Sequence, residues 1–229
     1  MNANPVPDAQ QTLSQVVLDH PECVPVFHRH RIDFCCGGEA TLAAASAQKK
    51  LPLDALLGEL GAAIVEHQRR PDCDPRQMPT PRLLEHIIER HHAYLRKTMP
   101  YVVGLSRKVA RVHGEHNPRL LALEAAVDEL DEALMPHLDD EEAELFPALC
   151  RDAEPERERL REDLRAMREE HRAVGELIDD IHDSSEEFRV PEWACTSYRA
   201  LFGELERLVE DVMLHVHLEN NVVAPRFGA

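Results

Sequence analysis

Apolar residues recur at intervals of three and four along most of the chain, which is the spacing of one buried face of an α-helix. After residue 81 this pattern predicts four long helices, separated by turns rich in glycine, proline or short polar side chains. Their expected bounds are Arg82–Val112, Pro118–Cys150, Glu154–His182 and Glu192–Asn221. Long helices joined by short turns typically form an up-and-down four-helix bundle. Part of residues 184–200 is expected to lie outside the fourth helix, because His215 otherwise sits too far along it to match His171.

Shorter helical segments precede this region, and a proline-rich stretch separates the two. The short segments are expected at about Pro21–His30, Thr41–Lys49 and Leu53–His67. Residues 71–81 carry four prolines, which predicts a non-helical linker. The sequence therefore predicts an all-α protein with a small helical domain at residues 1–70 and a bundle at residues 82–229.

Composition narrows the classes of function. The formal net charge of −17 repels phosphate backbones, so we expect no nucleic acid partner and no attraction to an anionic membrane. No apolar run approaches the roughly 18–20 residues of a membrane span, and no secretory signal is visible. We therefore expect a cytoplasmic protein whose six cysteines are reduced thiols.

Histidine interrupts the apolar stripe of each long helix, and in two helices a glutamate follows four residues later. The residues concerned are His92, His137, Glu141, His171, His215 and Glu219. A spacing of four places both side chains of each His-x-x-x-Glu pair on one helix face. A buried carboxylate without a partner is costly, so two glutamates and four histidines inside one bundle predict a bound metal pair.

The donor types favour iron. Four imidazoles and two carboxylates give each of two metals two histidines, with Glu141 and Glu219 shared between the metals. An oxo or hydroxo bridge would still leave an open position on each. Such mixed sites suit redox iron better than structural zinc, although manganese fits the same donors.

Other histidines are less clearly placed. His92 continues the stripe of Leu95 and Met99, so its neighbour His91 is expected to be exposed. His217 falls off the stripe of its helix. His113 is a candidate for a helix cap or for the wall of an access path.

A second motif, Asp-Phe-Cys-Cys-Gly-Gly, occupies residues 33–38. Two consecutive glycines predict a tight turn, and adjacent cysteines form only a strained disulfide. Cys35 and Cys36 are therefore candidate reactive thiols, with redox chemistry, metal transfer, partner contact and an incidental turn as the alternatives.

With these residues in view, the chain resembles the iron–sulfur cluster repair di-iron proteins, also called repair-of-iron-centres proteins. The resemblance covers nearly the whole chain: the Asp-Phe-Cys-Cys-Gly-Gly signature, the order of the His and His-x-x-x-Glu positions, and the ending at residues 215–221. It implies a hemerythrin-like bundle with two non-haem irons. It also implies a protein whose production is induced by nitric oxide or oxidative stress. It also implies a role in repairing damaged iron–sulfur proteins, to which Cys35 and Cys36 contribute and in which the protein acts as an iron donor.

Three other functions fit the same residues. The first is an enzyme that reduces nitric oxide or reacts with oxygen at the di-iron pair. The second is a sensor or carrier of nitric oxide or oxygen, although true hemerythrins carry His-x-x-x-His where this chain has Glu141 or Glu219. The third is a metal-free bundle. Assembly as a monomer or as a homodimer is left open by the sequence.

Overall fold

The computed structural model describes residues 6–67, 74–151 and 157–229 of the chain. Within these ranges every regular element is helical, and the β contact is an isolated antiparallel bridge between Thr12 and Thr41. The predicted all-α fold class is confirmed. In the same ranges, no helix is both long and apolar enough to cross a lipid bilayer.

The first two long helices of the bundle are each built from two α-helices joined by a π-helical segment. The first consists of α5 (Thr80–Ile87), the π segment Ile88–His92 and α6 (Ala93–His113). The second consists of α7 (Arg119–Asp140), the π segment Glu141–Leu145 and α8 (Phe146–Arg151). The π segments connect the α-helices without a break, so each of the two predicted helices is one continuous helix.

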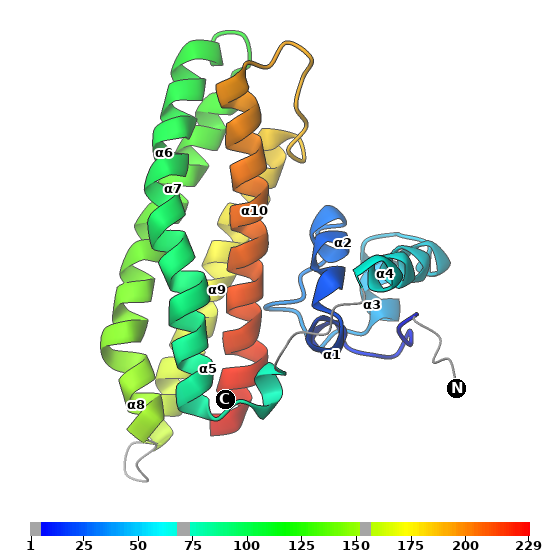
Figure 1. Ribbon diagram of the computed structural model, residues 1–229, viewed down its shortest axis with the longest axis vertical. Coiled ribbons are helices and arrows are strands. Elements are labelled where there is room, and N and C mark those ends of the chain that lie inside the picture. Colours follow the sequence, from blue (N-terminus) through cyan, green and yellow to red (C-terminus); the bar gives the residue numbers. More distant parts are fainter. Residues whose placement is uncertain (1–5, 68–73, 152–156) are drawn as a thin grey trace. The chain divides into compact units, whose positions relative to one another are not determined.

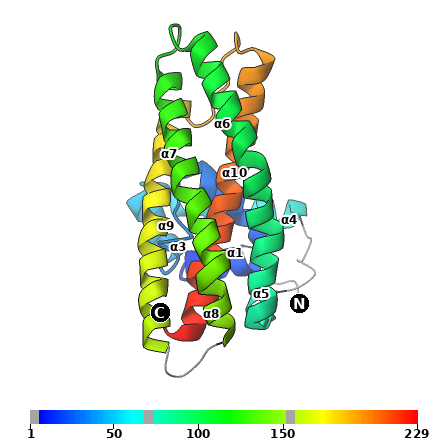
Figure 2. The ribbon, with the colours of Figure 1, turned by 90° about the vertical axis from the view of Figure 1, so that its left-hand side faces the viewer.

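The last two long helices are α9 (Arg157–Ser185) and α10 (Thr196–Leu218), which runs on into a π segment at Glu219–Val223 and a 3-10 turn at Ala224–Phe227. The long helices lie side by side in both views (Figures 1 and 2). α7 packs against both α6 and α9. The apolar stripes lie in the interior, where the buried residues include Leu130, Leu134, Leu164, Met167, Leu205 and Leu208.

The connection between α9 and α10 explains where the fourth helix begins. Glu186, Glu187 and Phe188 adopt left-handed backbone angles, with φ of 52°, 59° and 54°, directly after the end of α9. Helices end in this conformation because it turns the chain out of the right-handed helical path. α10 starts at Thr196, so the expectation that part of residues 184–200 lies outside the last helix is correct.

The N-terminal region contains α1 (Leu13–Asp19), a 3-10 turn at Pro21–Cys23, α2 (Val24–Arg29), α3 (Leu42–Gln48) and α4 (Leu53–His67). The first of these helices was not among the predicted segments. A capping box marks its start, in which the Thr12 hydroxyl accepts from the backbone of Gln15 and the Gln15 side chain accepts from the backbone of Thr12. This pattern is a recognised signal for a helix start.

The chain divides into two compact units. One comprises Met1–Pro79 with Met213–Arg226, and the other comprises Thr80–Val212 with Phe227–Ala229. The division passes through α10 after Val212, inside an uninterrupted helix. In the first unit, Phe27 and Phe34 are fully buried, with ring centroids 5.8 Å apart.

The proline-rich stretch is only partly described, because residues 71–73 lie outside the described ranges. Pro75–Gln77 forms a 3-10 turn, and the Arg226 guanidinium donates to the carbonyl oxygens of Pro75 and Met78. α5 already begins at Thr80, so Pro81 lies in its first turn. Proline is tolerated there because the first helical N–H groups have no partner within the helix.

Candidate metal centre

The six residues predicted as metal ligands are all buried, and we call them the His/Glu set. His137, at 7% exposure, is the most accessible of them. They come from the first long helix (His92), from the second (His137, Glu141), from α9 (His171) and from α10 with its π segment (His215, Glu219). The hydrophobic interior that surrounds them makes uncompensated charge there costly.

Within the bundle, imidazole nitrogens and a carboxylate converge around Glu141. The Nε2 atom of His137 lies 3.1 Å from Nε2 of His171 and 3.3 Å from one Glu141 oxygen. The Nε2 atom of His92 lies 3.5 Å from the other Glu141 oxygen. His92 and His137 thus direct Nε2 toward one buried carboxylate, and His171 directs its Nε2 toward that of His137.

The end of α10 supplies the remaining donors, with His215 Nε2 lying 2.9 Å from Glu219 Oε1 one helical turn later. Two groups emerge in which the ligand atoms all lie within 4.8 Å of one another: His92, Glu141, His215 and Glu219; and His137, Glu141, His171 and Glu219. Each group has two histidines, and both glutamates belong to both groups. The arrangement has the donor types and spacing to hold a pair of metal ions.

The three π segments coincide with members of this set, because they contain or begin at His92, Glu141 and Glu219. A π turn inserts one extra residue into a helix, and such insertions are frequent at functional sites. The insertion changes the direction of side chains relative to regular α spacing. Periodicity arguments based on 3.6 residues per turn do not anticipate these shifts.

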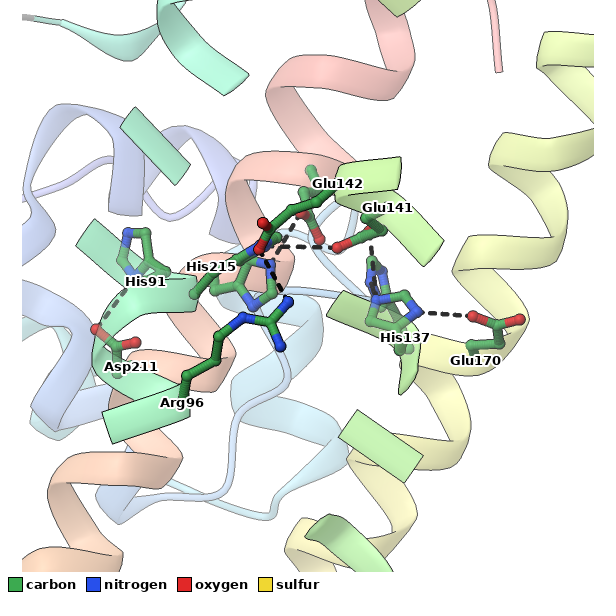
Figure 3. A network of polar contacts seen from close by, with 11 residues as sticks. His91, Arg96, His137, Glu141, Glu142, Glu170, Asp211 and His215 are labelled. Carbon is green, nitrogen blue, oxygen red and sulfur yellow. Dashed lines mark hydrogen bonds and ion pairs between the residues drawn. The ribbon is translucent and has the colours of Figure 1, made fainter. Parts of the chain in front are cut away.

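The expectation for His91 is wrong. Its side chain is 1% exposed, and Nδ1 lies 3.0 Å from Asp211 Oδ1 (Figure 3). His91 and His92 both lie in the π segment, where more residues share each turn and consecutive side chains differ less in direction. Both histidines can therefore face the interior.

Two carboxylates outside the set lie beside the Nδ1 atoms of two of its histidines, and Figure 3 shows one of them, Glu170, beside His137. A Glu142 oxygen lies 2.9 Å from His92 Nδ1 and also accepts from Arg96 at 3.1 Å. A Glu170 oxygen lies 2.7 Å from His137 Nδ1. Such contacts fix the ring orientation and place the proton on Nδ1, which leaves Nε2 free to donate its lone pair.

The sequence analysis did not identify these two carboxylates. Glu142 directly follows Glu141, and Glu170 directly precedes His171, so the signal was a charged neighbour of a ligand position. Burial alone would raise the pKa of Glu142, but its hydrogen bonds with His92 and Arg96 outweigh burial and lower the pKa. Glu142 therefore remains an anion that accepts hydrogen bonds.

A cavity of about 470 Å³ adjoins His137, Glu141 and Glu170. Its charged lining is mostly acidic and consists of Asp140, Glu141, Glu144, Arg151, Arg159, Asp163 and Glu170. All of these residues belong to the second compact unit. One edge of the His/Glu set is thus reached from a polar hollow.

The two other histidines considered from the sequence have different surroundings. His217 is fully buried, and its Nδ1 donates to the Phe34 carbonyl oxygen at 3.3 Å. Burial lowers the pKa of His217 to about 4. His113 Nε2 lies 3.2 Å from the Cys195 sulfur, and its ring contacts Trp193 and Tyr198.

Residues 33–38, here called the dithiol loop, pack against the end of α10 within the first compact unit. Cys35 is buried and Cys36 is half-buried. The side-chain amides of Asn220 and Asn221 both donate to the Cys35 carbonyl oxygen, at 3.2 and 2.9 Å. The motif at residues 33–38 and the ending at residues 215–221 thus meet in space.

Comparisons with known proteins match two family models to this chain. Residues 83–227 match the model of the hemerythrin HHE cation binding domain, and residues 9–64 match a domain of unknown function (DUF542). The chain is 34% identical over 216 residues to proteins named iron-sulfur cluster repair protein YtfE from Yersinia pestis (strain Pestoides F) and Yersinia pseudotuberculosis serotype IB (strain PB1/+). In both cases the similarity covers 94% of this chain and 96% of the relative.

Proposed function

Because this chain belongs to the family of iron–sulfur cluster repair proteins with a hemerythrin-like domain, we propose that it holds two non-haem irons and uses them to repair damaged iron–sulfur clusters. The relevant damage is oxidative or nitrosative. The partners are cytoplasmic iron–sulfur proteins that have lost part of their cluster. The irons serve as a source for rebuilding it.

One observation carries the proposal of two irons: both Glu141 and Glu219 belong to two four-residue donor groups, each completed by two different histidines. A single metal would leave part of this buried set without a cation. Neutral imidazoles and carboxylates without thiolates are donors that iron accepts readily, whereas structural zinc prefers closed tetrahedral sites that usually include cysteine.

The side chains around the His/Glu set fix the orientation of its histidines for metal binding. Glu142 and Glu170 orient His92 and His137, and Arg96 in turn holds Glu142. The cavity beside His137 provides the path by which a cation or a small molecule such as oxygen or nitric oxide exchanges with solvent. When bound, the iron pair supplies Fe²⁺ and a redox couple. Loss of iron is favoured when a ligand becomes protonated, because ligands must be deprotonated to bind metal.

The same residues could support nitric oxide reduction or reversible binding of oxygen or nitric oxide. The names of the relatives speak of cluster repair, so repair is the function that we propose. Stoichiometric binding of nitric oxide is compatible with that role. Catalytic turnover to nitrous oxide would instead indicate an enzyme.

The test is anaerobic transfer of ⁵⁷Fe. The full chain is loaded with ⁵⁷Fe and mixed with an iron–sulfur enzyme whose cluster has been damaged by nitric oxide. Recovery of enzyme activity is followed together with the Mössbauer signal of ⁵⁷Fe in the rebuilt cluster. We expect both to appear with the loaded chain and neither with the Glu141→Leu variant. Activity without ⁵⁷Fe in the cluster would contradict iron donation.

A further inference from the structure

The dithiol loop gathers three potential metal donors that the His/Glu set does not use. Ligand atoms of Asp33, Cys35 and Cys36 lie within 4.8 Å of one another. The two cysteine sulfurs are 3.9 Å apart, and Cys35 Sγ lies 3.2 Å from Asp33 Oδ1. All three residues belong to the first compact unit.

We propose that Asp33, Cys35 and Cys36 form a second, exchangeable metal site for a borderline or soft transition-metal cation such as Fe²⁺ or Zn²⁺. Thiolates are the donors that such cations prefer, and a carboxylate completes a third position. On binding, the two thiols lose their protons to solvent and form two metal–sulfur bonds. No electron transfer is involved.

The separation of the sulfurs favours chelation. Two thiolates on one tetrahedral metal, each at about 2.3 Å, are held roughly 3.8 Å apart. The observed separation is 3.9 Å, so a cation can be accommodated with little movement of the loop. A disulfide would instead require the sulfurs to approach to about 2.0 Å across one peptide bond, which is a strained closure.

The environment of Cys35 argues against a role as a free nucleophile. The neighbouring Cys36 thiol, burial and the Asp33 carboxylate all raise the pKa of Cys35 well above its usual value. The thiol therefore stays protonated near neutral pH and reacts slowly by itself. A metal ion must displace this proton, so binding at the site is expected to strengthen as the pH rises.

The loop is held in this conformation before any metal arrives. Asp33 Oδ1 accepts from the backbone N–H groups of Cys35 and Cys36, at 3.1 and 2.8 Å. Asn220 Nδ2 lies 3.7 Å from Cys36 Sγ, where it can donate to a thiolate. Such outer contacts orient metal ligands and tune their affinity.

Glycine is required for the close packing of this loop. A Cβ atom at Gly38 would lie 2.7 Å from Asn221 Oδ1 and 2.8 Å from the Phe34 carbonyl oxygen, closer than real Cβ contacts. The loop is therefore fixed against the helix end, and its donors need little ordering on binding.

Exposure indicates that the site exchanges its metal. Asp33 is exposed and Cys36 is half-buried, so solvent or a donor from another molecule can occupy the remaining coordination position. Structural metal sites usually close all positions with protein ligands. An open site suits transient handling of a cation.

The test is Co²⁺ titration of the iron-loaded full chain without air, because Co²⁺ bound by thiolates gives a charge-transfer absorption in the near ultraviolet. We expect saturation at one thiolate-bound Co²⁺ per chain, with release of about two protons measured in weak buffer. Cys36→Ser should abolish the absorption. Asp33→Asn should weaken binding about tenfold or more, since Asn can still accept the backbone N–H groups but lacks the charge.

The matched control replaces the exposed thiols Cys150 and Cys195 by serine and should leave the titration unchanged. Thermal unfolding of each variant shows whether it is folded. The proposal is overturned if the wild-type chain shows no thiolate absorption, if Cys36→Ser retains it, or if only the control variant loses it. A mass decrease corresponding to a Cys35–Cys36 disulfide, with no cobalt bound, would also overturn it.

Discussion

The His/Glu set and the dithiol loop differ in how far apart their residues lie in the sequence and in how deeply they are buried. In the His/Glu set, side chains from long helices converge in the buried interior, and the candidate donors are imidazoles and carboxylates. In the dithiol loop, three residues within a single turn supply two thiols and a carboxylate, partly open to solvent. The first arrangement suits retention of metal, and the second suits its exchange.

The two regions share one structural element, the end of α10 with the π segment that follows it. His215 and Glu219 belong to the His/Glu set, whereas His217, Asn220 and Asn221 bind the backbone of the dithiol loop. Alternating positions of one short segment thus serve different sites. This explains why residues 215–221 are dense in polar side chains although most of them are buried.

The largest effect is expected from removing a shared carboxylate. Glu141→Leu and Glu219→Leu should each keep the helical content but reduce iron affinity strongly. The reduction should exceed the roughly 10–100-fold loss that is typical when a residue hydrogen-bonded to a metal ligand is removed. Iron per folded chain and circular dichroism measure the two quantities. Glu129→Leu is the matched control, because Glu129 lies on α7, is exposed and does not line the cavity. Two irons per chain in both variants would refute the ligand assignment.

A smaller loss of iron affinity is expected from removing Glu142 or Glu170, the carboxylates that contact His92 and His137. Glu142→Ala removes the contact with His92, and Glu170→Ala removes the contact with His137. Each should weaken iron binding about 10–100-fold, with partial rescue by Gln, which can still accept a hydrogen bond from Nδ1. Competition with a chelator measures the affinity. Unchanged affinity in both would show that the histidines are oriented without them.

Two glycine substitutions probe the other region. Gly38→Ala should lower the free energy of unfolding by about 1–3 kcal/mol, because its Cβ would overlap Asn221 and Phe34. Gly58→Ala in α4 should instead raise it by about 0.5–1 kcal/mol, because nothing lies near that Cβ and alanine favours helix. Denaturant unfolding measures both. Equal effects of the two changes would mean that the loop is not packed as described.

The smallest effect concerns the order in which thiols react. Burial raises the pKa of Cys23 to about 12, and its side chain is fully buried, so it should be the last to be alkylated at mild alkaline pH. Cys150 and Cys195 are exposed and should react first. Peptide mass analysis over time gives the order. Early labelling of Cys23 in the folded chain would contradict the described core.

The all-α bundle was predicted correctly because it depends on helical periodicity, and the same periodicity predicted that the members of the His/Glu set face the interior, where all six are buried. His137 and Glu141, four residues apart, must share a helix face, whatever the details of the turns. The inward position of His91 was not predictable in this way, because it depends on the π segment at Ile88–His92. The contact of Glu170 with His137 depends on the packing of two helices, so the only local signal for it was that Glu170 adjoins the predicted ligand His171.

The dithiol loop shows the same limit more strongly. Its two glycines predicted a tight turn, but not that Gly38 would pack against Asn221, more than 180 residues later in the chain. Nor did the motif indicate that Asn220 and Asn221 would hold the Cys35 carbonyl group. Local patterns identified candidate residues, and only the fold supplied their hydrogen-bond partners.

The central claim is that Glu141 and Glu219 are shared by two iron ions. Anomalous diffraction at the iron absorption edge, from crystals grown without air, tests it directly. We expect two iron peaks, one beside His92 and His215 and the other beside His137 and His171, with both glutamates in contact with both peaks. A single peak, or two peaks that share neither glutamate, would contradict the account.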